Sequence, residues 1–221
     1  MLASSAGPAA ATLENLYINR RHGLAFLIPP SWTFQSLMEF GQIQAGVVLE
    51  IPDDIDPDLF RSLFREKILN AEDLAPIVWA ADEKRARPIP HAPMSPVDEL
   101  APSVSVYLEG TWKDDGPDPE AAPDLLAYVN HDLEFLRDYL SGFQLLESPR
   151  PMRVSGCDAV EFTIHFQWAH LDLAETVHMR QRMLYILQDP VIYSFIMLDH
   201  PELDPPLIHD FTGIIDSICI L

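Results

Sequence analysis

Two neighbouring stretches in the last third of the chain alternate between apolar and polar residues, and this pattern constrains the fold most. In the stretch DAVEFTIHFQW, every second residue from Val160 to Trp168 is apolar. The stretch TVHMRQRMLYILQ, residues 176–188, alternates in the same way. A period of two is typical of a β-strand with one buried face. Because only a short segment separates the stretches, we expect an antiparallel hairpin with its turn near Leu171–Asp172.

This turn also predicts which polar residues lie opposite one another. It pairs three sets of residues across the hairpin: His165 with His178, Thr163 with Arg180, and Glu161 with Arg182. The last pair has opposite charges, and opposite charges on facing strand positions stabilise a sheet. The charge pattern therefore favours this register.

Further segments have the composition of strands and helices. Strands are expected on both sides of a turn at Arg21–Gly23 and in the segments 45–52, 76–81, 103–110 and 191–198. Helices are expected from Asp56 to about Ile68, over about 123–140 and from Asp204 onward. The last helix is predicted to bury Leu207, Ile208, Phe211, Ile214, Ile215 and Ile218. The segment 191–198 is apolar on both faces, which favours a strand that is central or lies under a helix.

The stretch HGLAFLIPPSW, residues 22–32, looks like a covered strand that ends abruptly. Pro29 and Pro30 cannot donate to a sheet ladder, so the strand must stop there. Trp32 follows at once, where its ring can close the core and its indole N–H can reach a partner. We interpret this stretch as structural.

These elements predict one α+β domain, with an antiparallel β-sheet flanked by helices. The domain is expected to span residues 14–221, after a flexible N-terminal tail at 1–13. Prolines are dense in two segments, 82–102 and 112–124. Because proline interrupts both ladders and helices, we expect both segments to be surface loops.

Composition limits the classes of partner. The chain has 34 acidic and 14 basic side chains and a net charge of −20, which disfavours binding to nucleic acids or anionic membranes. The sequence lacks both a secretory signal and an apolar run long enough to span a membrane, so we expect a soluble, cytoplasmic protein. An exported form stays open if a signal was trimmed. Cys157 and Cys219 are expected to be unpaired, as small apolar residues.

Three parts of the chain resemble the Mog1/PsbP-like superfamily, which includes the bacterial DcrB-like proteins. They are YINRRHGLAFLIPPSW near the start, VSGCDAVEFTIHF, and TVHMRQRMLYILQDPVIYSFIML followed by a helix that ends in IIDSI. The resemblance implies an α/β/α sandwich that mostly binds other proteins. It implies no shared catalytic residues and no cofactor.

Three histidines near the predicted hairpin form a candidate metal site. His165, His170 and His178 lie within a short span, and Asp172 or Glu175 could complete the ligand set. The alternative is that the imidazoles lie on a half-exposed sheet face without a metal.

A second candidate site is a positively charged spot on the same predicted face. Arg180 and Arg182 project beside His178 on an otherwise acidic chain, and they could bind a carboxylate or phosphate. The alternative is that Glu161 neutralises them in a salt-bridged sheet surface.

The glycines do not form a phosphate-binding loop, and the motifs of common hydrolases and metalloproteases are absent. The leading hypothesis is therefore a noncatalytic protein-binding module, chaperone- or adaptor-like, whose partner is another protein. One alternative is a small-molecule or metal-dependent enzyme that uses the His165/His178 hairpin. Another is a structural subunit of a homo-oligomer, in which strand 191–198 forms an interface if it lies at a sheet edge.

Overall fold

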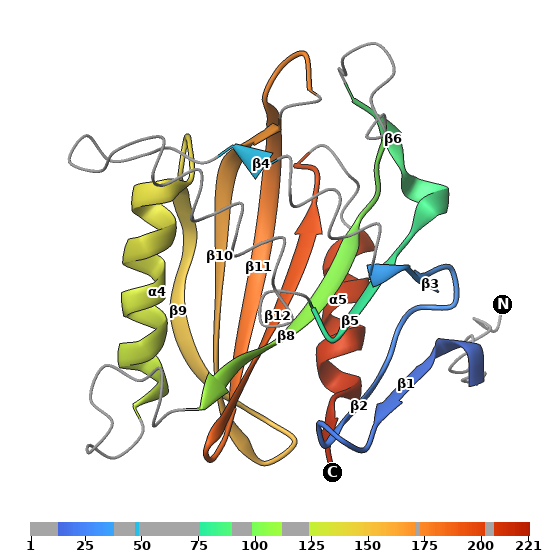
Figure 1. Ribbon diagram of the computed structural model, residues 1–221, viewed down its shortest axis with the longest axis vertical. Helices are drawn as coiled ribbons and strands as arrows, with labels where there is room; N and C mark the ends of the chain where they lie inside the picture. Colours follow the sequence, from blue (N-terminus) through green and yellow to red (C-terminus); the bar gives the residue numbers. More distant parts are fainter. Residues whose placement is uncertain are drawn as a thin grey trace, which may run out of the picture.

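The computed structural model describes residues 13–37, 47–48, 76–89, 99–111, 124–170, 173–201 and 206–221. Its centre is an 8-stranded antiparallel sheet in the order β3-β5-β8-β12-β11-β10-β4, with β9 also paired to β10 (Figure 1). The strands are β3 (Thr33–Phe34), β4 (Val47–Val48), β5 (Val78–Ala81), β8 (Ser103–Thr111), β9 (Gln144–Val154), β10 (Cys157–His170), β11 (Val177–Gln188) and β12 (Val191–Asp199).

A smaller sheet is formed by β1 (Leu16–Asn19), β2 (Leu24–Leu27) and β13 (Cys219–Ile220). Gly23 ends the turn between β1 and β2 with a φ of 62°, a conformation that glycine adopts at no steric cost. Both strands lie where the sequence predicts them, and the chain after β2 stops pairing at the two prolines. Trp32 is buried against Phe211, which confirms that it closes the core. Its indole N–H, however, has no partner among the described residues, contrary to prediction.

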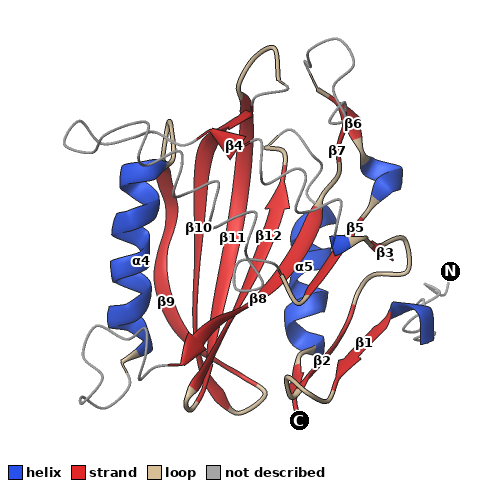
Figure 2. Cartoon of the chain, viewed as in Figure 1, coloured by secondary structure: helices blue, strands red, loops and turns tan. Residues whose placement is uncertain are grey.

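Two longer helices, α4 (Leu125–Tyr139) and α5 (Pro206–Ser217), lie beside β9 and β2 respectively (Figure 2). Asp124 caps α4 by accepting a hydrogen bond from the Ala127 amide. Gly142 has a φ of 62° just after α4, and a Cβ there would lie 2.9 Å from Cγ of Gln167. The predicted helix over 123–140 is thus confirmed, together with its glycine stop. No helix in the described ranges has the length and apolar character needed to cross a membrane.

The core is divided between the two faces of the central sheet. Phe211 and Ile214 of α5 pack with Leu184 and Phe195 on one face. Val129 of α4 packs on the opposite face with residues that include Phe162, Ile164, Met183 and Tyr185. Helices on opposite faces of an antiparallel sheet make the α+β layered fold that the sequence predicts.

Strand β12 lies between β8 and β11, inside the sheet. It is buried on both faces, with Phe195 against α5 and Ile192 in the other half of the core. Its central position confirms the prediction for segment 191–198. Because β12 is not at a sheet edge, it cannot pair with a strand of another chain. The predicted homo-oligomer interface through this strand is therefore wrong.

The predicted register of the β10–β11 hairpin is wrong by two residues. The direct partners are His165 with Arg180, Thr163 with Arg182, and Glu161 with Leu184. The connection runs from residue 171 to 176 and is longer than the tight turn that we assumed. A shift of two keeps every side chain on its predicted face, which is why alternation could not reveal the error.

Other parts of the sequence analysis need correction or lie outside the described residues. Strand β9 was not predicted, because it is largely exposed and contains two prolines. Ile208, assigned to the buried side of the last helix, is 54% exposed. The proline-rich segment 82–102 contains a short 3-10 helix, η2 (Glu83–Arg85), and a ladder between β6 (Arg87–Pro88) and β7 (Glu99–Leu100). The predicted helix from Asp56, the tail up to residue 12 and the segment 112–123 lie outside the described ranges.

Candidate functional site

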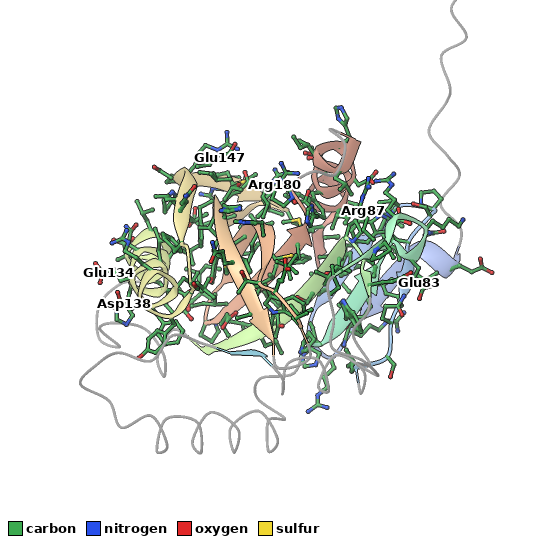
Figure 3. The ribbon with its side chains drawn as sticks, turned by 90° about the horizontal axis from the view of Figure 1, so that it is seen from above. Glu83, Arg87, Glu134, Asp138, Glu147 and Arg180 are labelled. Atoms are coloured by element: carbon green, nitrogen blue, oxygen red, sulfur yellow. The ribbon has the colours of Figure 1, made fainter. Side chains whose placement is uncertain are left out.

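The face of the hairpin that carries α5 changes from apolar to polar along its strands. Near α5 it presents Ala159, Leu184 and Ile186, which belong to the core. Further along, the same face presents the six polar residues singled out from the sequence: Glu161, Thr163, His165, His178, Arg180 and Arg182. In the view from above, Glu147 and Arg180 lie on the same side of the sheet as α5 (Figure 3). The predicted grouping of these residues on one face is therefore correct.

Glu161 is the centre of an ion-pair network that joins three strands. Its Oε1 accepts a hydrogen bond from Nε of Arg182, and its Oε2 accepts one from Nη2 of Arg150 at 2.8 Å. The Glu161 side chain is only 3% exposed, whereas that of Arg150 is 71% exposed. Arg182 also donates from Nη1 to the hydroxyl of Thr212 on α5, at 3.2 Å. The carboxylate therefore lies beneath the arginines that it holds.

Asp199, at the end of β12, holds the remaining arginine of this face in the same way. Nε of Arg180 lies 2.8 Å from Oδ1 of Asp199, and Nη2 lies 2.5 Å from Oδ2, which is a two-bond fork. These hydrogen bonds raise the pKa of Arg180, so its charge is secure. Burial raises the pKa of Asp199, and the hydrogen bonds and charge of Arg180 oppose that rise.

These ion pairs surround a cavity of about 480 Å³ between β9 and α5. Its lining residues come from β9, β10, β11, β12 and α5: Leu146, Glu147, Ser148, Arg150, Glu161, Thr163, Arg180, Arg182, Asp199, Ile208, Phe211 and Thr212. The large side chains of Leu146 and Ile208 are exposed at its two walls. Ligand pockets are commonly of this size, with an apolar surface and a few fixed polar groups.

The lining of this cavity has balanced formal charge, with three arginines against Glu147, Glu161 and Asp199. Two of the carboxylates are almost fully buried, and Glu147 accepts a hydrogen bond from Thr163 at 2.9 Å. Glu147 and Arg150 are the exposed charged residues of the lining, whereas Arg180 and Arg182 are only partly exposed. The accessible part of the cavity therefore carries both signs of charge, in a chain whose net charge is −20.

The two histidines of the hairpin meet next to this network, but they are not among the residues that line the cavity. Nδ1 of His178 lies 3.3 Å from Nε2 of His165, and the rings stack with centroids 5.2 Å apart. Burial and the nearby His178 lower the pKa of His165. His170 lies at the end of β10, but its side chain and Asp172 are outside the described residues. Among the described residues, no three potential metal ligands cluster.

Sequence reasoning identified Glu161, Arg180 and Arg182 but missed the residues that complete the cavity. Arg150 and Glu147 lie on β9, a strand without an alternating pattern. Asp199 closes an apolar strand, and the carboxylate directly after such a run was the available signal. Thr212 and Ile208 reach the cavity only through the packing of α5.

Neither a protein-family model nor a curated protein matches the chain. Three solved structures are similar to it at low identity. The cyanobacterial PsbP of Synechocystis is 11% identical, covers 97% of this chain and 98% of its own, and has a TM-score of 0.47. LpqN, involved in cell envelope biogenesis of Mycobacterium tuberculosis, is 13% identical, with 89% and 82% covered and a TM-score of 0.45.

A protein of unknown function from Pseudomonas aeruginosa is 20% identical, with 56% of this chain and 76% of its own covered and a TM-score of 0.37. Similarities at these TM-scores carry no argument about activity or partners, which rest on the site itself.

Proposed function

We propose that the chain is a noncatalytic protein-binding module, adaptor- or chaperone-like, that holds a segment of a partner protein in the cavity between β9 and α5. One observation carries this proposal: buried Glu161 and Asp199 hold arginines in a cavity with exposed Leu146 and Ile208 on its walls. Arginine beside exposed apolar side chains is a combination that protein interfaces favour.

The arrangement of the two buried carboxylates supports binding more than catalysis. A general base needs a lone pair within reach of the substrate proton. Glu161 directs both of its oxygens to Arg182 and Arg150, and Asp199 directs both of its oxygens to Arg180. These carboxylates therefore serve to position the guanidinium groups.

A differential capture experiment tests this function. The full-length chain, with a photo-crosslinker at Ser148, is compared with the same protein carrying Ile208→Asp or Ile18→Asp. Ile208 and Ile18 are similarly exposed, at 54% and 55%, but only Ile208 lines the cavity. We expect the parent chain and the Ile18→Asp variant to crosslink to the same partner protein. The Ile208→Asp variant should lose this crosslink. Identical crosslinking by all three would refute the proposal.

A metal site on the hairpin is a second candidate function, favoured by one distance. Two imidazole nitrogens bound to one tetrahedral zinc ion lie about 3.3 Å apart, given Zn–N bonds of about 2.05 Å. The ring nitrogens of His165 and His178 are separated by 3.3 Å. Zinc titration followed by calorimetry tests this candidate. A heat of zinc binding that is lost in the His165→Gln variant would support the metal site. The absence of heat above the buffer control would exclude it.

The proposed location is the cytoplasm, and the oligomeric state is open to measurement. Cys157 and Cys219 are free thiols, the state that a reducing cytoplasm maintains. The mass in solution, measured by light scattering, distinguishes a monomeric adaptor from a homo-oligomeric subunit.

A further inference from the structure

The arginines of the cavity have donor groups to offer a ligand. Arg180 uses Nε and Nη2, Arg182 uses Nε and Nη1, and Arg150 uses Nη2 alone. No other hydrogen bond from these three guanidinium groups to a described residue is present. A guanidinium carries more N–H donors than these bonds occupy. The remaining donors match a carboxylate, which accepts two parallel hydrogen bonds.

The ion pairs also fix the arginines before any ligand arrives. Arg180 is held by both oxygens of Asp199, and Arg182 is held between Glu161 and Thr212. Binding to groups already in place avoids much of the entropy cost of ordering side chains. Arg150 is the most exposed of the three and is bonded only to Glu161, so a ligand meets it first.

The walls add a second requirement, because the cavity is not purely polar. Leu146 on β9 and Ile208 on α5 are both exposed, and Phe211 contributes to the lining between the polar groups and the core. A ligand that buries these side chains gains binding free energy from the apolar surface that is removed from water. The favoured ligand therefore combines one carboxylate with adjacent apolar groups.

The charge of the whole chain decides what kind of molecule carries that carboxylate. With a net charge of −20, the chain repels small free anions at long range and attracts positively charged proteins. In a basic segment of a protein, a carboxylate can accept hydrogen bonds from the unused arginine donors, and the basic residues beside it are attracted by the net charge of the chain.

We infer that the cavity recognises a single Asp or Glu side chain flanked by apolar residues within a basic segment of the partner protein. This inference rests on the proposed protein-binding function and names the feature of the partner that is read. Arg150 is the residue that selects for the carboxylate.

Fluorescence polarisation with defined peptides tests the inference on the full-length chain. The probe is a lysine-flanked Leu-Glu-Leu peptide, acetylated and amidated so that the glutamate is its only carboxylate. The control peptide has Leu-Gln-Leu instead. We expect the glutamate peptide to bind at least about tenfold more tightly, the least that a charge-assisted hydrogen bond contributes.

Two matched variants assign the preference to the cavity. Arg150→Gln should abolish the preference for glutamate. Arg153→Gln should retain it, because Arg153 is similarly exposed at 67% on the same strand but pairs with Asp158 outside the cavity. Loss of the preference in the first variant alone supports the inference.

The inference would be overturned by a preference that survives Arg150→Gln, by equal binding of the two peptides, or by no binding of either at millimolar concentration. Displacement of the peptide by hexanoate at equal affinity would also overturn it, since that indicates a site for small acids. Equal binding of both peptides that still depends on Ile208 leaves the proposed function intact. The failures of the two proposals are thus distinguishable.

Discussion

Glu161 and Arg182 form an ion pair although they are not partners in the β10–β11 ladder. The residue directly opposite Glu161 is Leu184, and the residue directly opposite Arg182 is Thr163. Long side chains reach diagonal neighbours on the same face of a sheet, which is how this contact forms. Arg150, directly opposite Glu161 on β9, completes the network. The pair thus ties the hairpin to the strand beside it and to α5 through Thr212.

Replacement of Glu161 by glutamine should destabilise the fold. The buried carboxylate compensates Arg182, and removal of one member of a buried pair leaves an uncompensated charge. We expect a loss of roughly 2–4 kcal/mol in the free energy of unfolding, measured by urea denaturation. Asp158→Asn is the control, because its pair with Arg153 is exposed and should contribute at most about 1 kcal/mol. Equal effects of the two substitutions would contradict the role of Glu161.

The His165–His178 pair should make stability fall at mildly acidic pH. Burial and His178 lower the pKa of His165 in the folded state. Below about pH 6.5, the unfolded chain takes up a proton that folded His165 resists, so stability decreases with falling pH until the folded pKa is passed. His165→Gln should flatten this dependence between about pH 7 and 5, measured as melting temperature. The exposed His209, replaced by glutamine, serves as the control; the same flattening there would exclude His165 as the cause.

Asp132 should produce a dependence of the opposite sign. This residue of α4 accepts a hydrogen bond from the hydroxyl of Tyr185, and burial raises the pKa of its carboxyl. From about pH 4 upward, the folded state retains a proton that the unfolded chain has lost, so this contribution to stability decreases as pH rises through the folded pKa. The stability of the wild type relative to Asp132→Asn should therefore fall with rising pH in this range. Thermal melts at a series of pH values check this, and a constant difference would contradict it.

Trp32→Ala should lower the melting temperature markedly. The ring is buried and lies edge-on to Phe211 of α5, with centroids 6.0 Å apart. Truncation of a buried tryptophan costs about 3–5 kcal/mol, from lost burial and the remaining cavity. Calorimetry of the variant, with the exposed Ile18→Ala as control, measures the effect. An unchanged melt would show that Trp32 does not close the core.

The sequence by itself determined which face each side chain of the hairpin occupies. A β-strand alternates with a period of two, so the side chains of Phe162 and Met183 had to lie on one face of the hairpin, and those of Glu161, Arg180 and Arg182 on the other. The antiparallel, helix-flanked architecture followed from similar local patterns. Local signals also placed the end of β2 and both ends of α4, since capping and proline effects act within a few residues.

The tertiary structure alone decided the register, the cavity and its walls. A shift of two residues preserves every face, so the alternation of apolar and polar residues could not set the pairing of β10 with β11. Strand β9 has no pattern of its own, because its residues are mostly exposed and it is stabilised by pairing with β10. Arg150, Asp199 and Ile208 are far apart in the chain, and no local signal relates them. They meet because the pairing of β9 with β10 and the packing of α5 bring distant side chains to one face.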